Sequence, residues 1–282
     1  MKALLSLILM ISLFSFVSYL EISEPKPIGM VSIGNGTYIK QTETTVEEWM
    51  GFIANNDFRE ELFPEASVLD SSYSELFRDF RARGNSSYLV LVENKGVNKQ
   101  QFGELSVRPK KALGLLQDKY HQYISLRVPI TGISYSQVLQ FCKWKSDLLK
   151  SSGVFQDRIA VELPSVDLYR QFIPNIDSTC TREKCDSCTF YKFNFKIPRS
   201  KVSSCKGQDA YQGQALLRVD AYQPTSEGIY CLQGNAAEMT SKEGIAMGGS
   251  FFHFAKESYA EQFNEYSKPE LWLGFRYVAI AK

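Results

Sequence analysis

The chain has 282 residues, of which 44% are hydrophobic and 22% charged, a composition typical of a globular protein rather than a disordered one. Lys and Arg number 32 and Asp and Glu number 31, so the formal charge of +1 gives no electrostatic footprint for nucleic acid or an anionic membrane. The two histidines, His121 and His253, are too few for a metal centre that needs three imidazoles.

The N-terminal segment predicts export. Lys2 is followed by an apolar run from Ala3 to Val17 that only serines interrupt, as in the basic and hydrophobic regions of a signal peptide. The run is short for a membrane span, so we interpret residues 1–19 as a cleaved signal peptide rather than as an anchor. We therefore expect a secreted or periplasmic protein without a transmembrane span, in which residues 28–282 form one domain.

Short elements follow the N-terminal segment. Residues 30–39 alternate around a Gly-Asn-Gly turn, which predicts a β-hairpin. Thr44 and Glu47 form a capping-box pattern and predict a helix that carries Trp49. Residues 88–92 are apolar and mostly β-branched or aromatic in type, which predicts a strand.

Two further helices are expected in the middle of the chain. Ser134 and Gln137 form a second capping box, and the helix that follows places four side chains on one face. They are Val138, Phe141, Cys142 and Leu148. Pro164-Ser165 predicts the start of a third helix. Beyond residue 175 the pattern is one of loops and short strands, and without βαβ alternation the fold class is predicted to be α+β.

The interpretation of the six cysteines depends on the cellular compartment. Cys142 lies in the helical pattern and is expected to be a buried thiol. Four cysteines have the spacing C-x4-C-x2-C-x16-C, which suits either a zinc knuckle or two disulfide bonds. These are Cys180, Cys185, Cys188 and Cys205. Export favours disulfides, because the periplasm and the cell exterior are oxidising, but three pairings remain open.

Six segments in one order resemble a known family. They are Tyr38-Ile39-Lys40-Gln41-Thr42-Glu43-Thr44-Thr45, Pro129-Ile130-Thr131-Gly132-Ile133-Ser134-Tyr135 leading to Phe141-Cys142-Lys143-Trp144, Glu162-Leu163-Pro164-Ser165, Gly228-Ile229-Tyr230-Cys231-Leu232-Gln233-Gly234-Asn235-Ala236-Ala237-Glu238-Met239, Gly248-Gly249-Ser250-Phe251 and Leu273-Gly274-Phe275-Arg276. Together they resemble the formylglycine-generating enzyme (sulfatase-modifying factor) family over roughly residues 28–280. The resemblance implies a loop-rich α+β fold related to C-type lectins, and Arg276 is expected to form a buried ion pair.

The resemblance also implies a chemistry that this chain lacks. The family's enzymes oxidise a sulfatase cysteine to formylglycine with two active-site cysteines, which hold copper in the aerobic type. The matching positions here are His253 and Ser258, and no cysteine follows Cys231. One imidazole does not replace two thiolates, because Cu(I) prefers sulfur ligands and the redox step needs the thiolate. We therefore expect no copper, no catalytic residue and a residual cleft lined by Ser250, His253 and Ser258.

Calcium is the second property that the resemblance implies. The matching side chains and carbonyls of one family site are Asn194, Phe195, Asp209 and Tyr211. The other site matches Gly234, Ala236 and Glu238, but Cys231 stands where the family has an asparagine ligand. Because thiols are poor partners for calcium, we expect this second site to be weak or empty and Glu238 to make a structural hydrogen bond instead.

The sequence thus leads to one function and two alternatives. The main hypothesis is an exported, non-catalytic sulfatase-modifying-factor-like domain that acts as a binding or assembly module of the cell envelope, with an envelope protein or a glycan as partner. A divergent formylglycine-generating-type oxidoreductase is one alternative, and a carbohydrate-binding, lectin-like module is the other. Fold analogy alone does not name the ligand.

Overall fold

The computed structural model describes seven stretches of the chain. They are residues 27–83, 126–152, 158–173, 182–184, 189–191, 193–196 and 215–281. Its helices are α2 (Val46–Ala54), α3 (Ser71–Arg83), α6 (Tyr135–Ser151) and α7 (Val166–Phe172), with 3-10 helices η1 (Glu60–Leu62) and η4 (Ala255–Ser258). Within these stretches, no helix combines the length and apolar character needed to cross a bilayer. The predicted signal peptide and the predicted strand at residues 88–92 lie outside the described residues.

The first sheet contains the predicted hairpin. Its strands are β1 (Met30–Gly34), β2 (Thr37–Lys40), β10 (Val278–Ala281) and β3 (Ile159–Glu162), in that spatial order and all antiparallel. Asn35 and Gly36 connect β1 to β2 with φ angles of 51° and 67°, a left-handed conformation that Asn and Gly adopt more readily than other residues. The hairpin predicted around Gly-Asn-Gly is confirmed.

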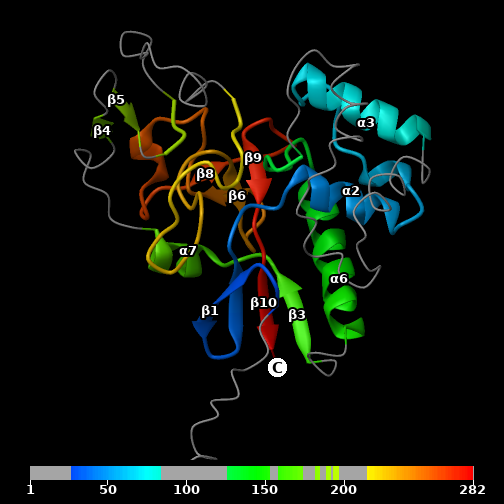
Figure 1. Ribbon diagram of the computed structural model, residues 1–282, viewed down its shortest axis with the longest axis horizontal. Coiled ribbons are helices and arrows are strands. Elements are labelled where there is room, and N and C mark those ends of the chain that lie inside the picture. Colours follow the sequence, from blue (N-terminus) through cyan, green and yellow to red (C-terminus); the bar gives the residue numbers. More distant parts are fainter. Residues whose placement is uncertain are drawn as a thin grey trace, which may run out of the picture.

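The first sheet is buried on both faces. Tyr38 and Ala279 are paired across β2 and β10 and pack into the larger apolar cluster, to which α2 and α6 contribute. Ile39 and Val278 are also paired, and they pack into a smaller cluster with Tyr169 of α7. Because successive side chains of a strand point to opposite faces, the same two strands serve both clusters. Figure 1 shows α6 and α7 at opposite sides of this sheet.

The second sheet continues directly into the first. Its strands are β8 (Asn264–Glu265), β7 (Ile245–Met247), β6 (Ala237–Met239) and β9 (Leu273–Phe275), of which only β6 and β9 are parallel neighbours. Only Arg276 and Tyr277 separate β9 from β10, so one stretch of chain passes from one sheet to the other (Figure 1). A separate antiparallel pair is formed by β4 (Arg182–Lys184) and β5 (Thr189–Tyr191). Short strands and few helices confirm the predicted loop-rich α+β class.

The first helix begins one residue later than the sequence pattern indicates. Thr45, not Thr44, is the N-cap of α2: its hydroxyl accepts from the amide of Glu48, and the Glu48 carboxylate accepts from the Thr45 amide. Thr44 is unavailable because its amide donates to the carbonyl of Phe275 and its carbonyl accepts from the amide of Ile130. A neighbouring segment therefore decides the start of this helix, which the local motif could not indicate.

The two later helices begin where their motifs predict. Ser134 and Gln137 form the capping box of α6, and the Ser165 hydroxyl accepts from the amide of Leu168 at the start of α7. The buried stripe of α6 is confirmed except at one position: Leu148 is only half-buried, and Leu149 packs against the core instead. Leu148 lies at the border of the stripe, whereas Leu149 falls near its middle.

Helix α6 also closes an edge of the first sheet. The Ser146 hydroxyl donates to the carbonyl of Cys142 at 2.8 Å and accepts from the amide of Val161 in β3 at 2.7 Å. An edge strand exposes unpaired amides, so this side-chain contact satisfies a group that the ladder does not. Cys142 is buried, as predicted.

Aromatic rings form the centre of the larger cluster. The rings of Trp49 and Phe141 are stacked with centroids 5.6 Å apart, and Phe275 meets both edge-on at 6.0 and 5.2 Å. The indole N–H of Trp49 donates to the carbonyl of Leu62, so the buried ring has no unsatisfied donor. These contacts join α2 and α6 to the strand that leads into Arg276.

We expect Phe141→Ala to destabilise the protein strongly. The side chain is fully buried among other rings, and loss of a buried Phe costs about 3–5 kcal/mol of unfolding free energy. Leu139→Ala, at an exposed position of the same helix, is the matched control and should change stability by less than about 0.5 kcal/mol. Urea denaturation measures both, and equal losses would contradict the packing described for α6.

Candidate functional site

The loop after β7 brings together the three residues expected to line the cleft. Gly249 has φ of 64°, and a Cβ atom there would lie 2.8 Å from the Cβ of Ser258, so only glycine allows this approach. On the same loop, the Ser250 hydroxyl and His253 Nδ1 form a hydrogen bond of 2.7 Å. Ser250, His253 and Ser258 are therefore held in one compact loop system.

The two serine hydroxyls of this loop make internal contacts. Ser250 Oγ also accepts from the amide of Phe252 at 3.1 Å, and Ser258 Oγ donates to the carbonyl of Ala255 at 2.6 Å. Both residues are buried. Their hydrogen bonds fix the backbone of the loop and offer no exposed hydroxyl to a substrate.

His253 is a partly buried ring on this loop. Burial lowers the pKa of its imidazole, Glu257 opposes this change and Lys196 adds to it, so the net direction is downward. The ring meets Trp272 edge-on with centroids 4.7 Å apart, and its backbone carbonyl accepts from the amide of Lys196 at 2.8 Å. His253 thus connects the loop after β7 to the segment of residues 193–196.

Arg276 and Glu238 form the buried ion pair that the sequence predicts. All five N–H groups of the guanidinium are used: three contacts reach the Glu238 carboxylate at 2.7, 2.9 and 3.2 Å, and three reach backbone carbonyls. Those carbonyls belong to Lys40 and Gln41 at the end of β2 and to Tyr230. Burial lowers the pKa of Arg276, but the charge and hydrogen bonds of Glu238, together with Glu43 and Cys231, raise it overall, so the guanidinium remains charged.

These contacts show what Glu238 does. Both carboxylate oxygens accept from Arg276, and the Tyr169 hydroxyl of α7 donates to Oε2. A calcium ion held by this carboxylate would have to displace a positively charged guanidinium. Glu238 therefore makes structural hydrogen bonds, and its carboxylate does not fit the calcium role considered for it with Gly234 and Ala236.

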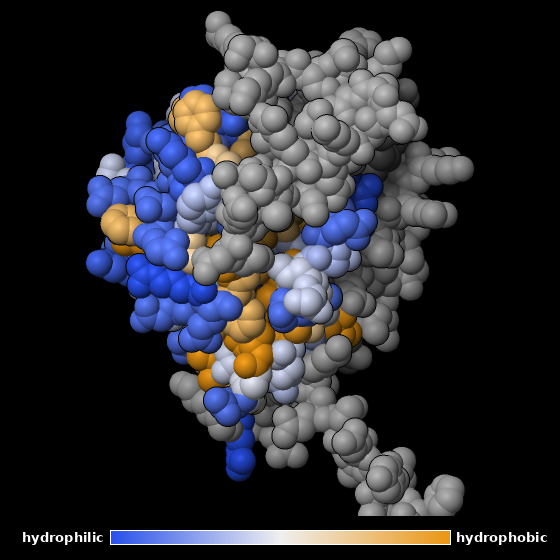
Figure 2. Space-filling view, turned by 90° about the vertical axis from the view of Figure 1, so that its left-hand side faces the viewer, coloured by the Kyte–Doolittle hydropathy of each residue, from blue (hydrophilic) through white to orange (hydrophobic). Residues whose placement is uncertain are grey.

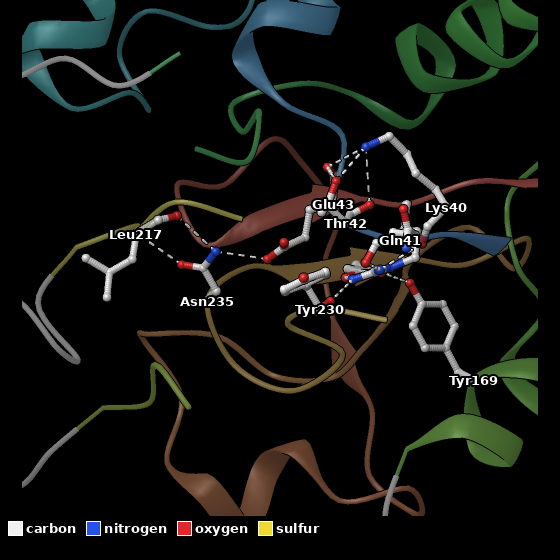
Figure 3. A network of polar contacts seen from close by, with 10 residues as sticks. Lys40, Gln41, Thr42, Glu43, Tyr169, Leu217, Tyr230 and Asn235 are labelled. Atoms are coloured by element: carbon white, nitrogen blue, oxygen red, sulfur yellow. Dashed lines mark hydrogen bonds and ion pairs between the residues drawn. The ribbon is translucent and has the colours of Figure 1, made fainter. Parts of the chain in front are cut away.

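Asn235 joins four segments beside this ion pair (Figure 3). Its amide nitrogen donates to Glu43 Oε1 at 2.9 Å and to the carbonyl of Leu217 at 3.1 Å. Its amide oxygen accepts from the Leu217 amide at 2.9 Å and from Asn194 Nδ2 at 3.1 Å. The backbone carbonyl accepts from the amide of Phe251, which ties the Gly-Gly-Ser loop to the same residue.

Part of the predicted calcium site at Asn194 lies outside the described residues. Asn194 and Phe195 are buried, and the Asn194 side-chain amide donates to the carbonyl of Ala215 and to Asn235. Asp209 and Tyr211 are not among the described residues, and neither are the cysteines predicted to form disulfides, Cys180, Cys185, Cys188 and Cys205. Calcium at this position and the disulfide bonds stay predictions.

Glu43 is a functional candidate that sequence reasoning missed. Its carboxyl is fully buried; Oε1 accepts from Asn235, and Oε2 has no hydrogen-bond partner. Burial and the charge of Glu238 raise its pKa to about 8, although Arg276 opposes the rise. Both Glu43 and Asn235 lie in segments that carry the family resemblance, but only the folded chain brings them together.

No family model matches the chain, and no curated protein matches it in sequence. PvdO from Pseudomonas aeruginosa is similar in structure, with a TM-score of 0.48 and 13% identity over 87% of this chain and 80% of PvdO. CarF has a TM-score of 0.45 and 14% identity over 87% of both chains. Treponema denticola variable protein 1 has a TM-score of 0.41 and 12% identity over 91% of this chain and 92% of its own.

With TM-scores of 0.41–0.48 and 12–14% identity, none of these likenesses assigns a family or a function to the chain.

Glu43 predicts a pH dependence of stability. Its pKa is raised from 4.5 to about 8 on folding, so between these values the folded chain holds a proton that the unfolded chain has released. The unfolding free energy should therefore fall as pH rises through this window, by up to about 1.4 kcal/mol per pH unit, and level off above it.

Glu43→Gln removes the titrating group and keeps an oxygen that accepts from Asn235. Its stability relative to the wild type should grow from pH 5 to pH 8, as followed by urea denaturation across that range. Glu261→Gln, at an exposed carboxylate, should leave the pH dependence unchanged. A parallel pair of curves for Glu43→Gln and the wild type would show that Glu43 is ionised in the folded state.

Proposed function

We propose that this chain is an exported, non-catalytic domain of the formylglycine-generating-enzyme type that binds or assembles with a protein of the cell envelope. The observation that carries the proposal is the identity of two residues: His253 and Ser258 stand where the family motif places its catalytic cysteines. Ser258 is buried with its hydroxyl bonded to a backbone carbonyl, and His253 Nδ1 is bonded to Ser250. These contacts serve the loop rather than a reaction.

The described thiols do not replace the missing pair. Burial raises the pKa of Cys142 to about 12, and burial together with Glu43 raises that of Cys231 well above its ordinary value. The thiolate is the nucleophile and the copper ligand, so neither residue supplies the reactive form at neutral pH. This supports loss of the oxidative chemistry with the scaffold retained.

Three further properties belong to the proposal. Export rests on the N-terminal signal pattern, and two disulfides among Cys180, Cys185, Cys188 and Cys205 follow from an oxidising compartment. A calcium ion at Asn194 and Asp209 follows from the resemblance.

The first test is catalytic. The chain without residues 1–19 is incubated with a sulfatase-type cysteine peptide, with and without copper, and the mass of the peptide is followed beside an active formylglycine-generating enzyme. We expect no formylglycine, because two thiolates are missing. Conversion that His253→Ala abolishes would overturn the proposal and establish the divergent oxidoreductase.

The second test asks for a partner. Site-specific photo-crosslinking in the native envelope from Phe254, on the loop after β7, should yield one dominant protein adduct. Crosslinking from Leu139, an exposed position on α6, is the matched control and should not yield that adduct. The absence of any adduct from the loop, with a glycan retained instead, would point to the lectin-like alternative.

A further inference from the structure

Two exposed phenyl rings flank a lysine ammonium on the loop after β7. Lys196 Nζ lies 5.0 Å from the ring centroid of Phe252 and 5.2 Å from that of Phe254. Both distances are within the range of cation–π attraction, so the three side chains hold one another in place. We call Lys196, Phe252 and Phe254 the Phe-Lys-Phe surface.

The backbone beneath this surface is fixed before any ligand binds. The Lys196 amide donates to the carbonyl of His253, which places the lysine segment against the loop. The Phe252 amide donates to Ser250 Oγ, and the Phe254 amide donates to Glu257 Oε2 at 2.8 Å. A surface held in this way loses little conformational entropy on binding.

The rings are open to solvent. Phe252 is 55% and Phe254 is 39% exposed, and both are among the few large apolar side chains at the described surface. Figure 2 shows one face of the molecule, on which apolar side chains stand among hydrophilic ones. Neighbouring exposed aromatic side chains are enriched at interaction sites.

The lysine has no carboxylate partner among the described residues. Every ion pair found there joins other groups, and the two rings are the contacts of the Lys196 ammonium. As far as the described residues go, a carboxylate supplied by a ligand would therefore complement this charge without displacing an existing pair.

Resting on the proposed function, we propose that the Phe-Lys-Phe surface docks an acidic segment of a partner polypeptide, with an apolar side chain on the phenyl rings and an Asp or Glu carboxylate on Lys196. The phenyl rings supply apolar burial and the ammonium supplies direction and charge selectivity. Together they form a compact anchor of the kind that dominates protein interfaces.

A sugar fits this surface less well. Recognition of a pyranose needs several directional hydrogen bonds, yet the neighbouring polar groups Ser250, Ser258 and Glu257 are already bonded within the loop. A bilayer also fits less well, because attraction to anionic lipid needs clusters of basic residues and this surface holds one. A polypeptide with one acidic and one apolar side chain meets the chemistry that is present.

The experiment uses the mature chain and an array of short synthetic peptides. Each carries one Leu or Phe and one Glu at varied spacing in a Gly-Ser background, with matched peptides in which Gln replaces Glu. We expect binding of Glu peptides by fluorescence anisotropy, weakened by salt, and about tenfold weaker binding of the Gln counterparts.

Variants assign the binding to the surface. Lys196→Met should abolish the preference for Glu over Gln, and Phe252→Ala or Phe254→Ala should weaken binding by about tenfold or more. Lys256→Met and Phe263→Ala, at other exposed positions, are the matched controls and should bind as the wild type does. Circular dichroism checks that every variant is folded.

Other outcomes overturn this inference. Equal binding of Glu and Gln peptides, or equal effects of Lys196→Met and Lys256→Met, would exclude the assigned carboxylate contact. Retention by phosphatidylglycerol vesicles or by a sulfated oligosaccharide, without peptide binding, would assign the surface to a lipid or a glycan. An envelope partner whose binding ignores all three residues would leave the proposed function standing and remove this surface from it.

Discussion

The fold depends on one buried guanidinium. Arg276 lies between the last strand of one sheet and the last strand of the other, and its donors reach the end of β2, the loop at Tyr230 and Glu238 in β6. A buried charge is tolerated only when its partners are complete, and here every N–H is used. The geometry of both sheets is therefore set relative to a single side chain, which also fixes α7 through Tyr169 and Glu238.

Hydrogen bonds extend from the neighbourhood of the Arg276–Glu238 pair to the loop after β7. Asn235 lies three residues before Glu238 and binds Glu43, Leu217 and Asn194, while its carbonyl holds Phe251 of the Gly-Gly-Ser loop. The Gly-Gly-Ser loop is thus supported by the same buried residues. Support of this kind suits recognition as well as catalysis, because both need side chains held in one orientation.

The sequence predicted the parts that local chemistry determines. The hairpin at Asn35, the cap at Ser134 and the ion pair of Arg276 follow from turn preference, capping and a motif, and the structure has all three. The sequence could not predict that the backbone of Thr44 is hydrogen-bonded to Phe275 and Ile130. Nor could it predict that Asn235 donates to the Glu43 carboxyl, because these contacts join residues far apart in the chain. The Phe-Lys-Phe surface could not be predicted for the same reason, since Lys196 and Phe252 belong to separate segments.

The position of β10 has a consequence for biosynthesis. This strand lies between β2 and β3 in the first sheet, yet it is made after both of them and directly after β9 completes the second sheet. The first sheet therefore cannot close until residues 278–281 have emerged, whereas β9 only adds an edge strand to the second sheet. Until then, the edges of β2 and β3 that will face β10 are unpaired and open to non-native pairing.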